Sequence, residues 1–145
     1  MNVTEVSFVR LNSRALPPRR VHDGDAGFDL HTIDEVVLSA GHRASVGTGI
    51  AISLPPGTAG LVLPRSGNAA RHGISLTNAP GLIDAGYRGE IRVLLINHGS
   101  DTVVFQPGDR IAQLVVIRLP EVDLVEVQEL DDSVRGSRGL GSTGR

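Results

Sequence analysis

The chain has 145 residues, 40% of them hydrophobic and 21% charged, and its formal net charge is -2, so one soluble domain with a hydrophobic core is expected. The charge gives no case for nucleic acid or a membrane surface, and no run approaches the roughly 18 apolar residues of a spanning helix. The start of the chain shows no secretory signal, and the absence of cysteine excludes disulfides and thiolate chemistry and fits the cytoplasm.

The first part of the chain predicts short strands separated by glycine and proline turns. Loose alternation over residues 3–11 indicates an edge or bulged strand, and residues 35–38, 43–54 and 58–63 indicate further strands. Between them, the stretch DGDAGFDLHT at 23–32 brings three carboxylates close together. Clustered oxygen ligands favour a hydrated Mg²⁺, and the alternative is a solvated turn.

A single short helix is predicted after the strand at 58–63. Ser66 can cap one or two helical turns, and Gly73 can end them. Free amides at the start of this helix, together with Arg65 and the serine hydroxyl, suit phosphate oxygens; a plain capped helix is the alternative. His72 is interpreted as a partly buried structural histidine, since no second His or Cys lies at metal spacing.

The stretch GLIDAGYRGEIRV at 81–93 predicts a hairpin, in which an apolar strand enters a tight turn and a second strand leaves it. Asp84 closes the first strand, so its carboxylate is presented at the mouth of the hairpin, as a general base would be. The alternative is a turn residue that hydrogen-bonds its own backbone. Asn78 lies just upstream, where its amide could read a base edge.

The second half of the chain continues with strands at 88–97, 101–105, 110–119 and 121–130. Gln113 interrupts an otherwise apolar run, so it either braces the backbone or meets a ligand. Eight or more short strands with one helical turn and no repeat predict an all-β sandwich or jelly roll. We expect this β domain to occupy residues 1–131.

Residues 132–145 have no apolar period and are rich in glycine, arginine and small hydroxyl residues. Such a tail is either disordered or an anion-binding arm, in which backbone amides, hydroxyls and guanidinium groups meet phosphate oxygens. A Walker loop is excluded, because the glycine-lysine ending and the following helix are absent.

Five stretches, in chain order, resemble the five motifs of the trimeric dUTP pyrophosphatases. They are AGFDL at 26–30, PRSG at 64–67, the segment from Asn78 through GLID at 81–84 to YRGE at 87–90, RIAQL at 110–114, and RG at 135–136 with GLGSTG at 139–144. The resemblance implies a distorted β jelly-roll homotrimer whose active sites are shared between subunits and covered by a flexible C-terminal arm. It also implies Mg²⁺-dependent hydrolysis of dUTP to dUMP and pyrophosphate, which limits uracil incorporation into DNA and supplies dUMP for thymidylate synthesis.

The resemblance also assigns roles to individual residues. Asp84 would activate a water for attack on the α-phosphorus, Tyr87 would lie against the deoxyribose and exclude a 2′-hydroxyl, and Asp29 would orient water on a Mg²⁺ carried by the triphosphate. Further substrate contacts fall into three groups. These are Asn78, Leu82, Ile83 and Asp84 at uracil, flanked by Arg92; Arg65, Ser66, Gly67 and Gln113 at the phosphates; and Arg135, Leu140, Gly141, Ser142 and Thr143 from the tail.

Two tail positions depart from the family pattern: Leu140 stands where an aromatic usually stacks on uracil, and Arg138 replaces a usual glycine. Weaker closure of the tail is therefore expected. Arg71 resembles a feature of the related dCTP deaminases, so deamination is an alternative, although Gly67 and the tail differ from those enzymes. A third hypothesis is a trimer that binds nucleotide and signals through a partner, which would not need Asp84.

Overall fold

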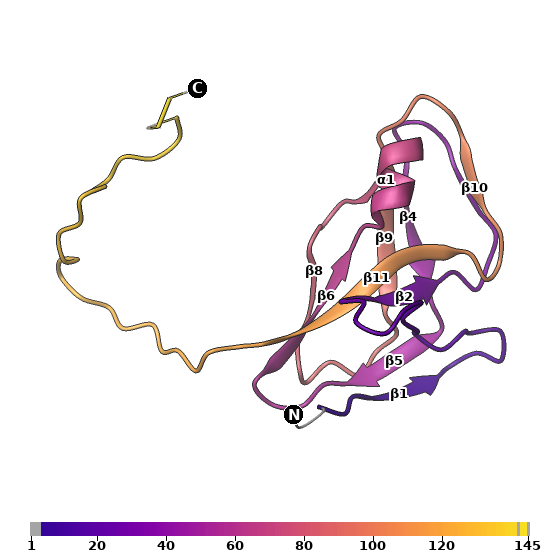
Figure 1. Ribbon diagram of the computed structural model, residues 1–145, viewed down its shortest axis with the longest axis horizontal. Coiled ribbons are helices and arrows are strands. Elements are labelled where there is room, and N and C mark those ends of the chain that lie inside the picture. Colours follow the sequence, from indigo (N-terminus) through magenta and orange to yellow (C-terminus); the bar gives the residue numbers. More distant parts are fainter. Residues whose placement is uncertain (1–3, 142, 145) are drawn as a thin grey trace.

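The computed structural model describes residues 4–141 and 143–144 and shows an antiparallel β body with a long C-terminal tail (Figure 1). The elements of the body are β1 (Ser7–Arg10), β2 (Phe28–His31), β3 (Val36–Leu38), β4 (Arg43–Gly47), β5 (Ile50–Ser53), β6 (Thr58–Leu63), α1 (Ser66–His72), β7 (Ile74–Leu76), β8 (Gly81–Ile83), β9 (Arg92–Asn97), β10 (Val103–Phe105) and β11 (Arg110–Arg118). The predicted all-β, jelly-roll type of fold with one short helix is confirmed.

Two sheets form most of the body. The larger has the order β2-β11-β6-β8 and the smaller the order β4-β9-β7, while β1 pairs with β5 and β10 pairs with β3. Because side chains alternate along each strand, one side of each sheet turns inward, as the fully buried Val93 and Leu95 of β9 show. They join Leu30 of β2 and Ile111 of β11 in one hydrophobic cluster. Burial of each such side chain contributes roughly 1.5–3 kcal/mol.

The predicted hairpin at 81–93 is not formed. The first strand, β8, pairs with β6 in the larger sheet, whereas β9 pairs with β4 and β7 in the smaller sheet. Residues 84–91 therefore cross from one sheet to the other instead of joining two paired strands. This crossover, residues 84–91, carries Asp84 and Tyr87 along the edge of the body between the sheets.

The predicted helix is present, but its start differs from the expectation. Ser66 is the first helical residue, and the capping position is taken by Arg65, without a side-chain capping bond. Gly73 ends the helix as predicted, in the left-handed conformation with φ 68°, which favours glycine. His72 is exposed, so its prediction as a partly buried histidine is wrong. This helix is too short to cross a membrane, and no other helix is found among the described residues.

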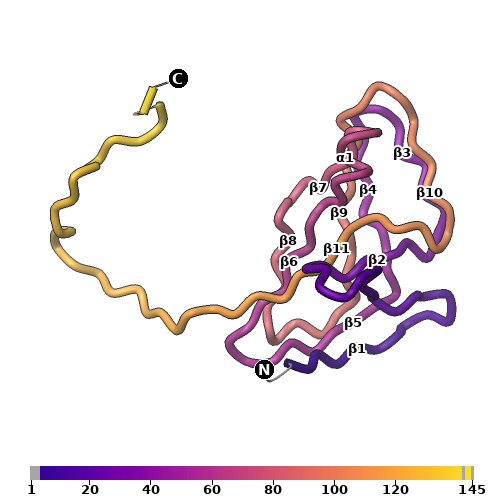
Figure 2. Tube along the Cα trace, in the orientation of Figure 1, coloured from indigo at the N-terminus to yellow at the C-terminus, as the bar shows by residue number. Residues whose placement is uncertain are grey.

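Two predictions concern the ends of the chain. The N-terminal strand is shorter than residues 3–11, spans Ser7–Arg10 and pairs only with β5, while residue 3 lies outside the described residues. The strand predicted at 121–130 is not formed, because those residues have no paired partner and run away from the body as part of the tail (Figure 2). The division of the chain at residue 131 stays a prediction.

Candidate active site

A pocket of about 310 Å³ opens beside the crossover 84–91. Its walls come from the end of β8, the crossover, the start of β9 and the facing strands β4 and β6. The lining residues are Ser45, Val62, Asn78, Gly81, Leu82, Ile83, Asp84, Tyr87, Glu90, Ile91, Arg92 and Leu94. The structure thus brings together the body residues that the sequence assigned to base, sugar and water activation, while Leu140 of the tail lies elsewhere. A larger hollow of about 420 Å³ between β1 and β11 contains none of them.

Asp84 stands at the rim of this pocket, directly after β8. Its backbone carbonyl accepts a hydrogen bond from the amide of Tyr87 at 3.0 Å, which closes the turn between the two residues. Its side chain is exposed, and no donor among the described residues bonds the carboxylate. The alternative of a turn residue bonded to its own backbone therefore does not hold, and the carboxylate is available to a water molecule.

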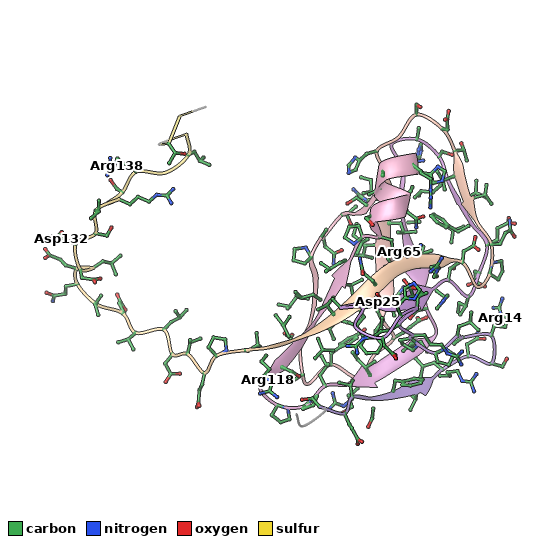
Figure 3. The ribbon with its side chains drawn as sticks, in the orientation of Figure 1. Arg14, Asp25, Arg65, Arg118, Asp132 and Arg138 are labelled. Atoms are coloured by element: carbon green, nitrogen blue, oxygen red, sulfur yellow. The ribbon has the colours of Figure 1, made fainter. Side chains whose placement is uncertain are left out.

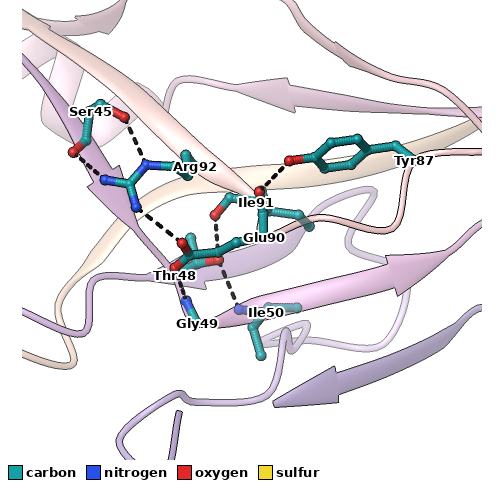
Figure 4. Close-up of polar contacts among 8 residues, drawn as sticks. All are labelled: Ser45, Thr48, Gly49, Ile50, Tyr87, Glu90, Ile91 and Arg92. Carbon is teal, nitrogen blue, oxygen red and sulfur yellow. Dashed lines mark hydrogen bonds and ion pairs between the residues drawn. The ribbon is translucent and has the colours of Figure 1, made fainter. Parts of the chain in front are cut away.

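Tyr87 projects from the same turn and is 47% exposed. Its hydroxyl donates to the backbone carbonyl of Glu90 at 2.9 Å (Figure 4). The ring lies close over Gly89, where an added Cβ atom would come within 2.5 Å of the Tyr87 hydroxyl oxygen. A glycine at 89 is therefore what lets the aromatic ring fold back over the crossover.

Asn78 and Leu82 supply the opposite wall. Asn78 is exposed and its amide has no hydrogen-bond partner in the part of the chain that the structure describes. The amide lies against Gly81, whose added Cβ would be 3.1 Å from Nδ2 of Asn78. Leu82 is 65% exposed, whereas Ile83 points into the core. An unpaired amide beside an apolar wall has the chemistry to bind a planar base.

The guanidinium group of Arg92 closes the far end of the pocket. Its Nε donates to Oγ of Ser45 at 2.9 Å, Nη2 donates to the Ser45 carbonyl at 2.8 Å, and Nη1 contacts Oε2 of Glu90 at 3.0 Å (Figure 4). Because all three nitrogens have protein partners, Arg92 forms a wall of the pocket. It flanks the pocket, as the sequence predicted.

A second cluster of polar residues surrounds Asp29 on the larger sheet. Oδ1 of Asp29 accepts from Nε of Arg65 at 3.1 Å, and Oδ2 accepts from Nη1 of Arg110 at 3.3 Å. Gln113 is opposite Asp29 across the β11–β2 pair, and its Nε2 donates to the Pro64 carbonyl at 2.9 Å. The amide of Gln113 thus braces the backbone just before Arg65, as one of its two predicted interpretations requires.

Ser66 and Gly67 begin α1 immediately after this cluster. The Ser66 side chain is exposed, and Gly67 lies under the guanidinium of Arg71, with an added Cβ 3.0 Å from Nη2. None of these described phosphate-side residues, nor Arg65 or Gln113, lines the pocket beside the crossover. Within one chain, the predicted base site and the predicted phosphate site are therefore separate.

The three carboxylates at 23–32 do not form the expected cation cluster. Among the described residues no group of three His, Cys, Asp or Glu side chains is placed to hold a metal ion. Asp25 instead accepts the amide of His22 through Oδ2 at 2.9 Å, so the stretch before β2 is a turn. Both oxygens of Asp29 are paired with arginines. With both oxygens paired, the Asp29 carboxylate has no oxygen left over for direct contact with a metal ion.

Near Asp29, His31 is a titratable group that the sequence did not single out. Its Nδ1 is buried without a hydrogen-bond partner among the described residues. Burial lowers the pKa of His31 below its ordinary value, and the arginines at 110, 65 and 19 lower this pKa further, while Asp29 opposes the shift. The neutral imidazole is therefore favoured beside the phosphate-side cluster.

The predicted tail residues are not brought to either cluster. Arg135, Leu140, Gly141 and Thr143 are exposed along the tail, and Ser142 lies outside the described residues. Arg135 and Arg138 bond each other's carbonyl groups through Nε at 2.9 and 3.0 Å. Figure 3 shows Arg65 on the body beside α1, with Asp132 and Arg138 far along the tail. Their role at the site stays a prediction.

Sequence reasoning gave no role to three residues that organise the two clusters. Arg110 pairs with Asp29, while Ser45 and Glu90 hold Arg92. Ser45 faces Leu94 across the β4–β9 pair, so its approach to Arg92 depends on a pairing over a distance of 47 residues in the chain. For these contacts, the one local sign in the sequence was the opposite charge of Glu90 and Arg92, two residues apart, which allows an ion pair.

Comparison with known proteins identifies the family of this chain. The dUTPase family model matches residues 14–144. A deoxyuridine 5′-triphosphate nucleotidohydrolase of Corynebacterium glutamicum is 55% identical, covering 99% of this chain and 97% of the relative. One of the same name from Gloeobacter violaceus is 53% identical, covering 99% of each chain. The chain belongs to the dUTPase family. The sequence prediction is confirmed at this level.

Solved structures of this family have the same fold. The dUTPase of Staphylococcus bacteriophage 80alpha, solved with dUpNHpp, superposes with a TM-score of 0.89 at 27% identity, over 99% of this chain and 100% of the other. A mutant dUTPase from phage phi11 of S. aureus, described with a structural Mg(II) ion, superposes with a TM-score of 0.81 at 27% identity. The match covers 87% of this chain and 98% of the other. Family membership disfavours the deaminase alternative.

Proposed function

We propose that Asp84 is the general base with which this dUTPase converts dUTP and water to dUMP and pyrophosphate. The hydrolysis itself follows from membership of the family. The observation that carries the proposal is the unpaired Asp84 carboxylate at the rim of a pocket that also presents Asn78 and Tyr87. The carboxylate takes a proton from water as its oxygen attacks the α-phosphorus, and the bond from that phosphorus to the bridging oxygen breaks, releasing pyrophosphate.

The pocket provides the selectivity for a deoxyuridine nucleotide. The free amide of Asn78 and the backbone of β8 at Leu82 and Ile83 face the space for uracil. The ring of Tyr87 occupies the space beside the sugar, where a 2′-hydroxyl would collide with it. A close wall rejects an added methyl or hydroxyl group sterically, which separates dUTP from dTTP and UTP.

The residues around Asp29 form the phosphate side of the site. Nε of Arg65 is engaged by Asp29, and its two Nη groups have no partner among the described residues, so they can bond phosphate oxygens. Ser66 and Gly67 follow at the start of α1, and Gln113 braces the backbone that carries Arg65. From the tail, Arg135, Leu140, Gly141, Ser142 and Thr143 would close over the bound nucleotide.

Mg²⁺ is the cofactor that this arrangement fits. When bound to the triphosphate it neutralises charge that develops on the phosphate oxygens. Asp29 would hold the ion's water molecules, because Mg²⁺ usually keeps several waters and is bound through one or two carboxylates together with substrate phosphates. The residues of the chain would orient the phosphates, with Asp29 holding the guanidinium of Arg65 in place.

We propose a homotrimer in which neighbouring copies complete each site. Two observations support this proposal. The phosphate-side residues do not line the pocket of their own chain. The segment 119–130 carries apolar side chains that have no packing partner, with Val122 72%, Leu124 101% and Val127 57% exposed. Exposed apolar surface of this kind marks an interaction site. A chain without cysteine suits the cytoplasm, where we propose that the enzyme acts.

A substrate panel tests this function. With Mg²⁺, the purified protein is expected to hydrolyse dUTP and to discriminate strongly against dTTP, dCTP and UTP. Pyrophosphate release and ammonia release are measured in parallel for each nucleotide. Ammonia from dCTP would instead support a deaminase. Tight binding of dUTP without any hydrolysis would favour a nucleotide-binding signalling protein.

A further inference from the structure

We propose that Glu90 is a positioning residue for sugar selectivity: its carboxylate fixes the crossover 84–91 so that the ring of Tyr87 stays against the deoxyribose. The inference rests on the proposed role of Tyr87 as the residue that excludes a 2′-hydroxyl. It adds a second residue of the same pocket, acting through Tyr87, on which that exclusion depends.

The carboxylate of Glu90 bridges two elements that face the crossover. Oε1 accepts the backbone amide of Gly49 at 2.9 Å, and Oε2 contacts Nη1 of Arg92 at 3.0 Å (Figure 4). The Glu90 side chain is 25% exposed, so both contacts are partly shielded from water. Gly49 lies in the corner between β4 and β5 with φ +67°. Glu90 therefore fastens the crossover to this corner.

The backbone next to Glu90 is fastened to the same corner. The amide of Ile91 donates to the Ile50 carbonyl at 2.7 Å, and the buried hydroxyl of Thr48 donates to the Ile91 carbonyl at 2.6 Å. These bonds hold the planar peptide unit between Glu90 and Ile91, which includes the Glu90 carbonyl, and the Glu90 carboxylate adds a further anchor at the same corner. On the other side of Glu90 are Gly86 and Gly89, which leave that part of the crossover free to move unless side chains restrain it.

Tyr87 takes its restraint from Glu90. Its hydroxyl donates to the Glu90 carbonyl at 2.9 Å. Among the described residues this is the hydrogen bond that the side chain of Tyr87 makes, and the ring is otherwise half-exposed. A shift of the Glu90 backbone would therefore move the acceptor of the Tyr87 hydroxyl and loosen the ring. The position of the sugar wall then depends in part on the anchoring of Glu90 by its carboxylate.

A purely structural role, in which Glu90 serves only to hold Arg92, fits the contacts less well. Arg92 also donates to Ser45 twice, at 2.9 and 2.8 Å, so its guanidinium keeps two anchors without Glu90. The Gly49 amide, in contrast, has Glu90 as its acceptor. The hydrogen bond that Glu90 alone supplies is the one to the Gly49 amide, which adds a side-chain anchor to the backbone bonds of Ile91 at the same corner.

Gly47 offers a way to disturb the carboxylate without replacing it. A Cβ atom added at Gly47 would lie 2.7 Å from Oε1 of Glu90 and 3.3 Å from Nη1 of Arg92. Such a contact forces a side chain to move, and Gly47 has no positive φ that would strain an alanine. Gly47→Ala should therefore displace the Glu90 carboxylate while every hydrogen-bonding group remains in the chain.

The test compares kcat/KM for dUTP with kcat/KM for UTP. Glu90→Ala and Gly47→Ala are expected to lower this ratio by about 3–10-fold, the loss that corresponds to one hydrogen bond of ordinary strength. Glu90→Gln, which can still accept the Gly49 amide, should keep most of the ratio. Asp34→Ala is the matched control, since it removes an exposed ion pair to Arg14 of the same 3.0 Å length and should leave the ratio unchanged.

A double-mutant cycle separates positioning from general stability. Tyr87→Phe removes only the hydroxyl that bonds Glu90, so Glu90→Ala should change the ratio little in that background. Full additivity would overturn the proposal, as would an unchanged ratio in both Glu90→Ala and Gly47→Ala when Tyr87→Ala lowers it. An unchanged ratio in Tyr87→Ala would instead refute the role of Tyr87 itself. Should Glu90→Ala fail to fold, Gly47→Ala and Glu90→Gln carry the same test.

Discussion

The carboxylate of Asp29 lies 3.1 Å from Nε of Arg65, and its second oxygen lies 3.3 Å from Nη1 of Arg110. The Asp29 side chain is only 15% exposed, so these ion pairs are stronger than pairs on an open surface. By engaging Nε, Asp29 leaves the two Nη groups of Arg65 in a fixed direction for phosphate oxygens. The carboxylate thus fixes the side chains of Arg65 and Arg110 relative to each other.

Asp29→Asn is expected to raise the Mg²⁺ concentration needed for half-maximal activity by about 10–100-fold, the range for residues that support a metal's ligands. The amide loses the charge that orients Arg65 and attracts the ion's water. Activity is measured across a Mg²⁺ titration at saturating dUTP. Asp25→Asn is the control from the same stretch, because an amide oxygen can still accept the His22 amide. Equal Mg²⁺ requirements in both variants would contradict the role of Asp29.

Asp84→Asn is expected to lower turnover by about 10²–10⁴-fold, the usual contribution of a general base. The amide has nearly the same shape and cannot take up the proton, so binding of the non-hydrolysable dUpNHpp should be retained. Turnover comes from pyrophosphate release and binding from calorimetry. Asp101→Asn, at an exposed position in the loop before β10, serves as the control. Turnover near that of the unmodified protein would remove Asp84 from the mechanism.

Much of the fold could be predicted from local pattern. Alternation and turn residues located β6 at Thr58–Leu63 and β11 at Arg110–Arg118 closely, and Gly73 ended the helix because only a residue without Cβ adopts its conformation readily. The motif residues Asn78, Asp84 and Tyr87 were likewise correctly expected to share one pocket, since they are near one another in the chain.

Pairing between distant segments could not be predicted in the same way. The strands on either side of the crossover 84–91 look like a hairpin, yet each finds its partner in a different sheet. The alternating segment 121–130 has the pattern of a strand but pairs with no strand among the described residues. Side-chain periodicity reports that a segment can bury one face; it does not identify the surface that covers that face.

Deletion of residues 135–145 is expected to leave the proposed trimer intact while dUTP hydrolysis collapses. The tail makes no contribution to the hydrophobic cluster, whose members end at Leu114 and Val116. Light scattering gives the assembly state and pyrophosphate release gives the activity. Dissociation of the truncated protein, or full activity in it, would show that the tail is not a cover for the site.

His31 predicts a pH dependence of stability. Burial lowers its pKa below the ordinary 6.5, so below about pH 6.5 the unfolded chain binds more protons at this site than the folded chain. Stability contributed by the neutral imidazole is therefore present above that pH and is lost as the pH falls toward the lowered pKa. The free energy of unfolding, measured with urea at several pH values between about 5 and 7, should depend less steeply on pH in His31→Gln than in the unmodified protein. The exposed His72→Gln serves as the control; equal slopes in both variants would contradict the burial argument.

Leu140 marks the point where this chain departs from the usual aromatic of its family, and its side chain is fully exposed on the tail. A leucine can cover a base by apolar contact but has no π face. Aromatic stacking on a base is worth about 1–3 kcal/mol by alanine substitution, of which leucine should recover part. Leu140→Phe is therefore expected to tighten dUTP binding by about 0.5–1.5 kcal/mol.

The gain should appear as a lower KM with kcat nearly unchanged, because the ring would contact the base far from the reacting phosphorus. Val134→Phe is the matched control: it adds the same ring at another fully exposed tail position that is assigned no contact with substrate. A KM that falls equally in both variants would indicate a non-specific hydrophobic contact between the tail and the nucleotide. An unchanged or raised KM in Leu140→Phe would mean that the tail docks differently in this protein. Arg138 would then be the cause, because a bulky charged side chain restricts a backbone that the usual glycine leaves free.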